Sequence, residues 1–384
     1  MKPRINPLPK NKIPLFAPYL TSEELAAVNR VIRSGWLTMG EETTNFESAI
    51  TRYTGAKYAI AANNGTAALH LAILAAGIQA GDEIITTPYT FIASTNCILY
   101  EKAIPVFADI NPNTLAIDVN QIESKITGKT KAILAVDVFG YPAEWETIKL
   151  LARKYHLQII EDGAEALGAK YQGEKLGSLG HLTTFSFFPN KQITTGEGGI
   201  IVTNSPTKYN LIKSLVNQGR LSGQSQLDHN YLGYNYRMGE LPAALGRSQL
   251  KKIDQFLANR RLVAKCYQEQ LQGIPGISLP QADDLNHERS WFVYTIRLDK
   301  NINRSMVEAE LKSQNIPVKA YFPAIHLQPF LKQFGYRPGD FPVCESVSQT
   351  TLAMPFYTGM AKKAVLMVCR ELKKILKQNV RYSR

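Results

Sequence analysis

Short apolar runs alternate with helical patterns along the first two thirds of the chain. Runs of strand length cover residues 58–62, 83–87, 104–108 and 132–138, and helical patterns cover 67–76 and about 94–100. Strands separated by helices are typical of a sheet whose strands run mainly parallel and which is covered by helices. The pattern therefore predicts an α/β protein in which residues 1–250 form one large domain with an N-terminal arm.

A different pattern begins near residue 250. A helical stretch rich in Lys, Arg and Gln covers 250–271, and it is followed by a strand at 291–298, a helix at 305–313 and a last helix at 361–377. The chain contains no internal repeat and no low-complexity linker. We therefore predict a small second α/β domain over residues 251–384, which begins with the linking helix.

Composition indicates a folded protein and narrows its partners. The chain has 384 residues, of which 45% are hydrophobic and 20% charged, and these values are ordinary for a globular protein with ample core. The net charge is +12, but the Lys and Arg residues are scattered apart from a basic stretch at 362–384. No zinc-finger spacing or RNP-like aromatic motif is present, which argues against nucleic acid. The charge fits either a solvated surface or the steering of an acidic substrate such as a diphosphate.

Other sequence signals are negative. The four cysteines lie far apart, without a CxxC pair or a His at ligand spacing, so we expect neither a metal site nor a disulfide. The N-terminal segment is basic and interrupted by prolines, unlike a secretory signal. The longest nearly apolar run, residues 67–78, is too short to cross a bilayer. We therefore expect a cytoplasmic protein without a membrane partner.

The segment over residues 159–203 carries the strongest candidate chemistry. Asp162 ends an apolar run, and Lys191 lies between a second apolar run at 185–188 and the Gly-rich turn GEGG at 196–199. Both residues are predicted on loops at the edge of a sheet, where they would face one crevice. A pyridoxal cofactor needs a lysine amine for a Schiff base and a carboxylate that keeps its pyridine nitrogen protonated. Asp162 and Lys191 can supply these two groups.

On these motifs the chain resembles the DegT/DnrJ/EryC1/StrS family of nucleotide-sugar aminotransferases, from about residue 13 to beyond residue 360. The resemblance implies the aspartate-aminotransferase fold (fold type I), with a large domain that binds pyridoxal 5′-phosphate, a small C-terminal domain and a homodimer. It also implies that Lys191 forms the Schiff base and that Asp162 holds the pyridine nitrogen. Relatives that dehydrate the sugar carry His in place of this lysine, so Lys191 implies transamination.

Three further motifs match the cofactor site of the family. The polar turn at 63–66 passes directly into an apolar helix, whose first N–H groups and dipole suit a phosphate, although an ordinary N-cap has the same pattern. The resemblance implies that Gly65 and Thr66 hold the cofactor phosphate, that Ser186 donates its hydroxyl to it, and that Phe91 stacks on the pyridine ring. By themselves, Ser186 would be interpreted as a strand serine and Phe91 as a core residue.

Asn235 and His326 each have a functional and a structural interpretation. Asn235, in the motif GYNYRM, corresponds to a family residue that reaches the phosphate of the neighbouring subunit, so each site of a homodimer would be shared between two chains. A turn asparagine before the helix near residue 240 is the alternative. His326 falls in a loop that in the family lies near the sugar nucleotide, and a buried structural histidine is equally compatible with the sequence.

Glu165 departs from the commonest family pattern, which has Gln three residues after the acid. An ionised Glu cannot donate a hydrogen bond to the phenolic oxygen of the cofactor, so Glu165 would have to share a proton with that oxygen or with the Schiff base. A minority branch that resembles GDP-perosamine synthase carries Glu in the same context. We therefore place Glu165 with Lys191 and Asp162 among the predicted catalytic residues.

The predicted reaction moves the amino group of L-glutamate, which leaves as 2-oxoglutarate, onto a nucleotide-linked 4-keto-6-deoxyhexose. The specific candidate is conversion of GDP-4-keto-6-deoxymannose to GDP-perosamine for a surface polysaccharide such as a lipopolysaccharide O-antigen. Three alternatives remain open on the same motifs: a UDP- or dTDP-linked keto sugar, a cyclitol acceptor, and a non-catalytic regulator that binds the cofactor.

Overall fold

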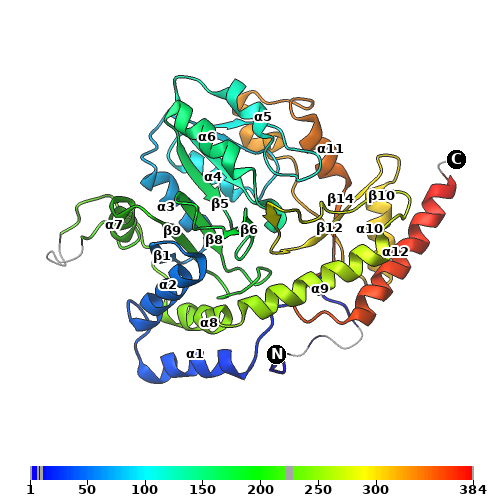
Figure 1. Ribbon diagram of the computed structural model, residues 1–384, viewed down its shortest axis with the longest axis horizontal. Helices are drawn as coiled ribbons and strands as arrows, with labels where there is room; N and C mark the ends of the chain where they lie inside the picture. Colours follow the sequence, from blue (N-terminus) through cyan, green and yellow to red (C-terminus); the bar gives the residue numbers. More distant parts are fainter. Residues whose placement is uncertain (1, 7, 9–11, 222–227, 383–384) are drawn as a thin grey trace.

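The computed structural model describes residues 2–6, 8, 12–221 and 228–382, and Figure 1 shows how they fold. The predicted N-terminal arm and the predicted basic tail therefore lie partly outside the described residues. Residues 4–6 pack against the body of the protein, because Arg4 Nη2 donates to the carbonyl of Thr358 at 2.8 Å and Ile5 N–H donates to the carbonyl of Leu20 at 2.9 Å.

A seven-stranded sheet forms the centre of the first two thirds of the chain, in the order β1-β9-β8-β5-β4-β2-β3. Strand β9 runs in the opposite direction to the other six strands, so the sheet is mixed but mainly parallel. The predicted fold class is therefore confirmed. The strands in this order are Tyr58–Ala62, Gly199–Thr203, Leu182–Ser186, Gln158–Asp162, Thr130–Val136, Glu83–Thr86 and Ile104–Phe107.

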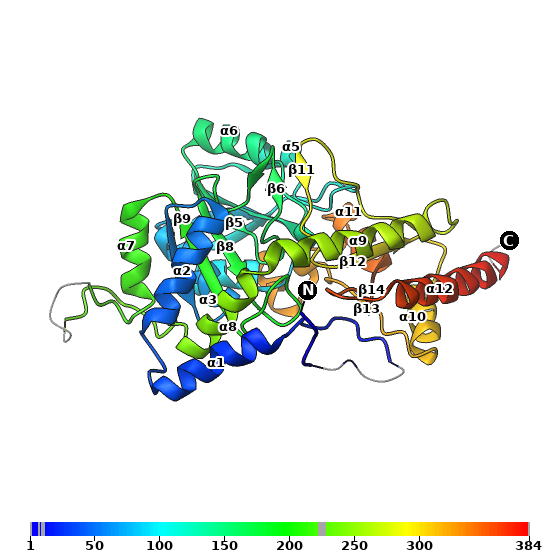
Figure 2. The same cartoon turned by 60° about the horizontal axis from the view of Figure 1, so that its bottom comes forward.

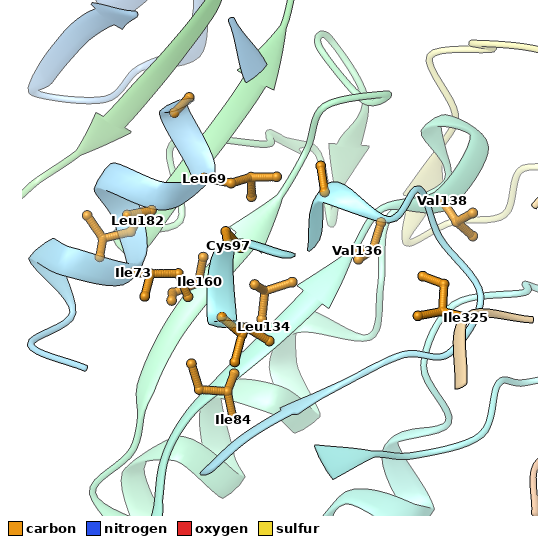
Figure 3. Packing of buried hydrophobic residues seen from close by; sticks show 14 of the residues in the cluster. Leu69, Ile73, Ile84, Cys97, Leu134, Val136, Val138, Ile160, Leu182 and Ile325 are labelled. Atoms are coloured by element: carbon orange, nitrogen blue, oxygen red, sulfur yellow. The ribbon is translucent and has the colours of Figure 1, made fainter. Parts of the chain in front are cut away.

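Helices cover both faces of this sheet. On one face, α3 packs on β8 and β9, and its apolar side chains join those of α4 and the sheet in one buried cluster, part of which Figure 3 shows. The second buried cluster lies on the other face and includes residues of α2, α6 and α8. The helices are α1 Ser22–Ser34, α2 Glu41–Thr54, α3 Gly65–Ala75, α4 Ala93–Tyr100, α5 Val119–Ile122, α6 Trp145–Tyr155, α7 Pro206–Leu215 and α8 Glu240–Leu250, with 3₁₀ turns at Glu123–Lys125 and Val138–Gly140.

A four-stranded antiparallel sheet, in the order β10-β12-β14-β13, forms the centre of the last third. Its strands are Ile277–Ser278, Tyr294–Leu298, Thr351–Met354 and Lys319–Ala320. Helix α9, Ile253–Leu271, runs from α8 toward this sheet and lies along α12, Lys362–Tyr382 (Figures 1 and 2). The other helices here are α10 Arg304–Ser313 and α11 Pro342–Thr350, with 3₁₀ turns at Ile325–Leu327 and Pro329–Phe334.

A small third sheet joins the two parts, because β11, His287–Glu288, pairs with β6, Lys170–Tyr171, which pairs with β7, Glu174–Lys175. The predicted division into residues 1–250 and 251–384 stays a prediction. The strand predicted from residue 291 begins only at Tyr294, because Trp291 has a positive φ of 53° that a strand does not accommodate.

Candidate functional site

A cavity of about 820 Å³ lies beside the carboxyl ends of β5 and β8, the N-terminus of α3, and the segment that follows β13. The walls come from residues that are far apart in the sequence, between Asn64 and Pro323. Crevices at the carboxyl ends of parallel strands are the usual place for ligands in α/β proteins. Of the residues predicted from the sequence, the cavity is lined by Gly65, Thr66, Phe91, Asp162, Glu165, Ser186 and Lys191.

Asp162 is the last residue of β5, and only 4% of it is exposed. Its Oδ2 accepts a hydrogen bond from Ser94 Oγ at 2.6 Å, and its Oδ1 accepts one from the N–H of Ala164 at 3.1 Å. Burial raises the pKa of Asp162 above its ordinary value, although these two hydrogen bonds and the charge of Lys191 act in the opposite direction. A nearby cation, such as a protonated pyridine nitrogen, stabilises the charged form of a buried carboxyl.

Lys191 and Glu165 face each other across the same cavity. Lys191 Nζ lies 3.5 Å from Glu165 Oε1, while Glu165 Oε2 accepts a hydrogen bond from the N–H of Phe139 at 2.8 Å. Burial raises the pKa of Glu165, and the charge of Lys191 lowers it. The carboxyl of Glu165 can therefore exist in its neutral form more readily than an exposed one, which suits a group that shares a proton.

The N-terminus of α3 forms a cradle at another wall of the cavity. Asn64 caps the helix, since its Oδ1 accepts a hydrogen bond from the N–H of Ala67 at 2.8 Å, and Gly65 and Thr66 are the first helical residues. A Cβ on Gly65 would lie 2.9 Å from Ser186 Cβ, so glycine allows the hydroxyl of Ser186 to approach the helix end. Free N–H groups, a helix dipole and a hydroxyl together suit a phosphate.

These residues fit pyridoxal 5′-phosphate. The cavity offers a lysine amine, a buried acid without a full counter-charge, and a cradle that a Cβ on Gly65 would narrow. Phe91 also lines it, is 61% exposed, and can present an aromatic face to a ring. The structure thus brings together every predicted cofactor residue except Asn235.

Asn235 and His326 lie elsewhere. Asn235 is exposed and does not line the cavity of its own chain; its backbone forms an isolated bridge with Asn217. His326 is fully buried, with its ring 4.7 Å from that of Phe341 and its Nε2 3.1 Å from Glu345 Oε1. His326 therefore does not line the cavity in this structure, and its proposed position near the sugar nucleotide stays a prediction.

The structure adds site residues that sequence reasoning missed. Ser94 holds Asp162, as described above, and the ring centroid of Phe292 lies 4.2 Å from Lys191 Nζ. Lys319 and Tyr321 also line the cavity. Ser94 belongs to the motif that contains Phe91, so it was within reach of the sequence, whereas no local pattern connects Phe292 to a lysine 101 positions earlier.

No helix within the described ranges is long and apolar enough to cross a membrane. In the same part of the chain, no group of three or more His, Cys, Asp or Glu side chains could hold a metal ion.

With this fold and this site, the protein falls in the class of aminotransferases that use pyridoxal 5′-phosphate. The chain belongs to the DegT/DnrJ/EryC1/StrS aminotransferase family, whose pattern matches residues 18–373. The predictions of family, cofactor and enzyme class are therefore confirmed, and the protein is a sugar aminotransferase.

Individual relatives are similar over nearly their whole length. GDP-perosamine synthase of Escherichia coli O157:H7 is 36% identical over 361 residues, which cover 94% of this chain and 97% of that protein. Spore coat polysaccharide biosynthesis protein SpsC of Bacillus subtilis (strain 168) is 35% identical over 379 residues, which cover 95% and 97%. The solved PLP-form of Spr1654 from Streptococcus pneumoniae has a TM-score of 0.91 at 26% identity, and the match covers 96% of this chain and 99% of that chain.

Proposed function

We propose that this aminotransferase takes the amino group of L-glutamate and transfers it to C4 of a nucleotide-linked 4-keto-6-deoxyhexose, with GDP-4-keto-6-deoxymannose as the first candidate. The reaction would yield GDP-perosamine for a surface polysaccharide. The observation that carries the chemistry is the convergence of Lys191, Glu165 and Asp162 on the cavity at the start of α3. The similarity to GDP-perosamine synthase over 94% of this chain supports the choice of substrate.

Each of these residues has a distinct task. Pyridoxal phosphate, when bound, supplies an electron sink for the carbon that loses its proton. Lys191 Nζ removes the proton from Cα of glutamate, and in the second half-reaction it delivers a proton to C4 of the sugar. Asp162 holds the proton of the pyridine nitrogen through a charge-assisted hydrogen bond, and Ser94 keeps the carboxylate oriented. The start of α3 and Ser186 bind the phosphate.

Glu165 gives this site a proton that can be shared. Its Oε2 is held by the N–H of Phe139, so its Oε1, 3.5 Å from Lys191 Nζ, is the oxygen that faces the reacting groups. A Gln at this position would be a permanent donor, whereas Glu can donate only when it is protonated. We therefore expect Glu165→Gln to retain cofactor but to change the pH dependence of turnover on the acidic side.

We also infer a homodimer with shared active sites. In the segment between α1 and α2, three large apolar residues are more than half exposed: Trp36 at 64%, Leu37 at 53% and Met39 at 58%. Such an apolar patch is typical of a protein contact. Thr38 within it bridges to Gly239, four residues after the exposed Asn235, so the patch and Asn235 occupy neighbouring parts of the surface.

Subunit complementation tests the shared site. Lys191→Ala and Asn235→Asp should each inactivate a homodimer, the second because a carboxylate repels the phosphate. Co-expressed heterodimers would hold one site with both lesions and one with neither, so about half of the native activity per dimer should return. No recovery in isolated heterodimers would exclude a role of Asn235 in the partner's site.

Substrate choice is tested on the purified enzyme in its pyridoxamine form. We expect rapid amine transfer to GDP-4-keto-6-deoxymannose and slower transfer to UDP- or dTDP-linked 4-keto-6-deoxy sugars and to scyllo-inosose. Preference for one of the other acceptors would replace the proposed substrate but leave the aminotransferase assignment in place. Failure of glutamate to convert the cofactor in a single turnover would favour a regulator.

A further inference from the structure

We propose that Phe292 is a positioning residue for Lys191. The face of its ring lies over the Lys191 amine and holds the ammonium group once the amine has taken up a proton, and Arg260 fixes the ring by binding the backbone of the same segment. This inference rests on the proposed role of Lys191, and it concerns how that residue keeps its place when it is not bonded to the cofactor.

The contact between ring and amine is desolvated. Lys191 Nζ lies 4.2 Å from the ring centroid of Phe292, Phe292 is 3% exposed, and the side chain of Lys191 is 12% exposed. Attraction between a cation and an aromatic face is strongest where water is excluded. The other neighbour of the amine is Glu165, whose carboxyl changes charge with its protonation state. The ring does not titrate, so it holds the ammonium group whether Glu165 is neutral or charged.

Arg260, on α9, holds the segment that carries the ring. Its Nε donates to the carbonyl of Trp291 at 2.7 Å and its Nη2 donates to the carbonyl of Phe292 at 2.6 Å. Arg260 is 3% exposed, and within the described ranges it has no ion pair with a carboxylate. A planar guanidinium that binds two successive carbonyls fixes the orientation of the peptide between them.

The backbone at this point is unusual. Trp291 has a φ of 53°, which is uncommon for a bulky residue and persists only where the surroundings enforce it. A second contact holds Ser290, the residue before Trp291. Gln192 Nε2 donates to Ser290 Oγ at 2.7 Å and to the carbonyl of Glu165 at 2.5 Å. Residues 290–292 are thus hydrogen-bonded both to Arg260 of α9 and to Gln192, which follows Lys191 in the chain.

Helix α9 runs from α8 toward the second sheet and packs on α12, so this arrangement connects the position of the lysine to the packing of the last third of the chain. The chemical consequence is specific. An aromatic face favours the ammonium form of Lys191, which arises when the amine takes up a proton, whereas a leucine of similar size would fill the space without this preference.

The test uses the full-length protein freed of cofactor and labelled with trace acetic anhydride, with the Lys191 peptide quantified by mass spectrometry. Only the neutral amine reacts, so the ratio of the labelling rate near pH 8 to that near pH 11 reports protonation, because a change in access alters both rates alike. In Phe292→Leu this ratio should rise roughly 3- to 30-fold. Phe292→Tyr, which keeps the ring face, should restore the native ratio.

A matched control separates the ring contact from cavity packing in general. Phe188 also lines the cavity, and none of its described contacts is with the Lys191 amine, so Phe188→Leu should leave the ratio unchanged. Arg260→Lys should raise it in the same direction but less. An unchanged ratio in Phe292→Leu, or an equal rise in Phe188→Leu, would overturn the proposal, and an unchanged ratio in Arg260→Lys would overturn the part played by Arg260. If pyridoxal phosphate does not protect native Lys191 from labelling, the proposed function fails, whatever the variants show.

Discussion

Replacement of Gly199 by alanine should displace the start of α3, which forms the proposed phosphate site. Gly199 is the first residue of β9, and its added Cβ would lie 2.4 Å from the carbonyl oxygen of Asn64, 2.7 Å from the carbonyl carbon of Asn64 and 2.9 Å from Cα of Gly65. These are backbone atoms of the cap and the first residue of α3, so no rotation of a side chain can relieve the clash. The start of α3 must move away from the sheet.

The expected loss can be estimated in two parts. Overpacking of a close contact costs about 1–3 kcal/mol, and the lower chain entropy of alanine offsets roughly 0.5–1 kcal/mol of it. The free energy of unfolding should therefore fall by up to about 2.5 kcal/mol. Displacement of one N–H that binds the phosphate costs about 1.5–3 kcal/mol more in binding, which corresponds to roughly 10- to 100-fold weaker affinity for pyridoxal phosphate.

Urea unfolding of the cofactor-free protein measures the first quantity, and absorbance titration with pyridoxal phosphate measures the second. Gly128→Ala is the matched control, because a Cβ there meets no atom within 4 Å and the backbone is not left-handed. If Gly199→Ala unfolds and binds cofactor like Gly128→Ala, the close approach of β9 to α3 has no part in the cradle.

Three other variants test the site and its surroundings. Lys191→Ala should remove the absorbance band of covalently held cofactor and slow the glutamate half-reaction by about 10²- to 10⁴-fold or more, as stopped-flow spectra will show; a native rate would exclude Lys191 as the base. Asp162→Asn keeps the shape but removes the charge, so turnover should fall by about 10²- to 10³-fold while cofactor still binds; an unchanged rate would mean that another group holds the pyridine nitrogen. Burial and the charge of Glu161 raise the pKa of Asp137 in the folded protein. Such an acid stabilises the fold fully below its unfolded pKa, and this stabilisation is lost as the pH rises through its folded pKa. As the pH rises above about 4, the unfolding free energy of Asp137→Asn should therefore increase relative to that of the native protein. If the difference between the two unfolding free energies stays constant from that pH to neutrality, the raised pKa is contradicted.

Much of the fold followed from local pattern. The strand at Tyr58–Ala62 was predicted with the bounds that the structure has, and the helices near 67–76 and 94–100 were found within two residues of α3 and α4 at their starts and one at their ends. The strand and α3 could be predicted because their burial in the core requires runs of mainly apolar side chains. Asp162 and Lys191 could be predicted for a related reason, since a polar residue at the end of such a run must lie at the sheet edge.

What the sequence by itself determined, then, was the alternation of buried strands and helices and the local motifs that place an acid, a lysine and a helix start at loop positions. Only the tertiary structure decided which distant groups meet there. It packed the ring of His326 against that of Phe341, placed the ring of Phe292 over Lys191, and brought Gly199 against the first turn of α3. These contacts join segments separated by tens to hundreds of residues, and they depend on how the folded elements pack together, for which no periodicity along the chain carries a signal.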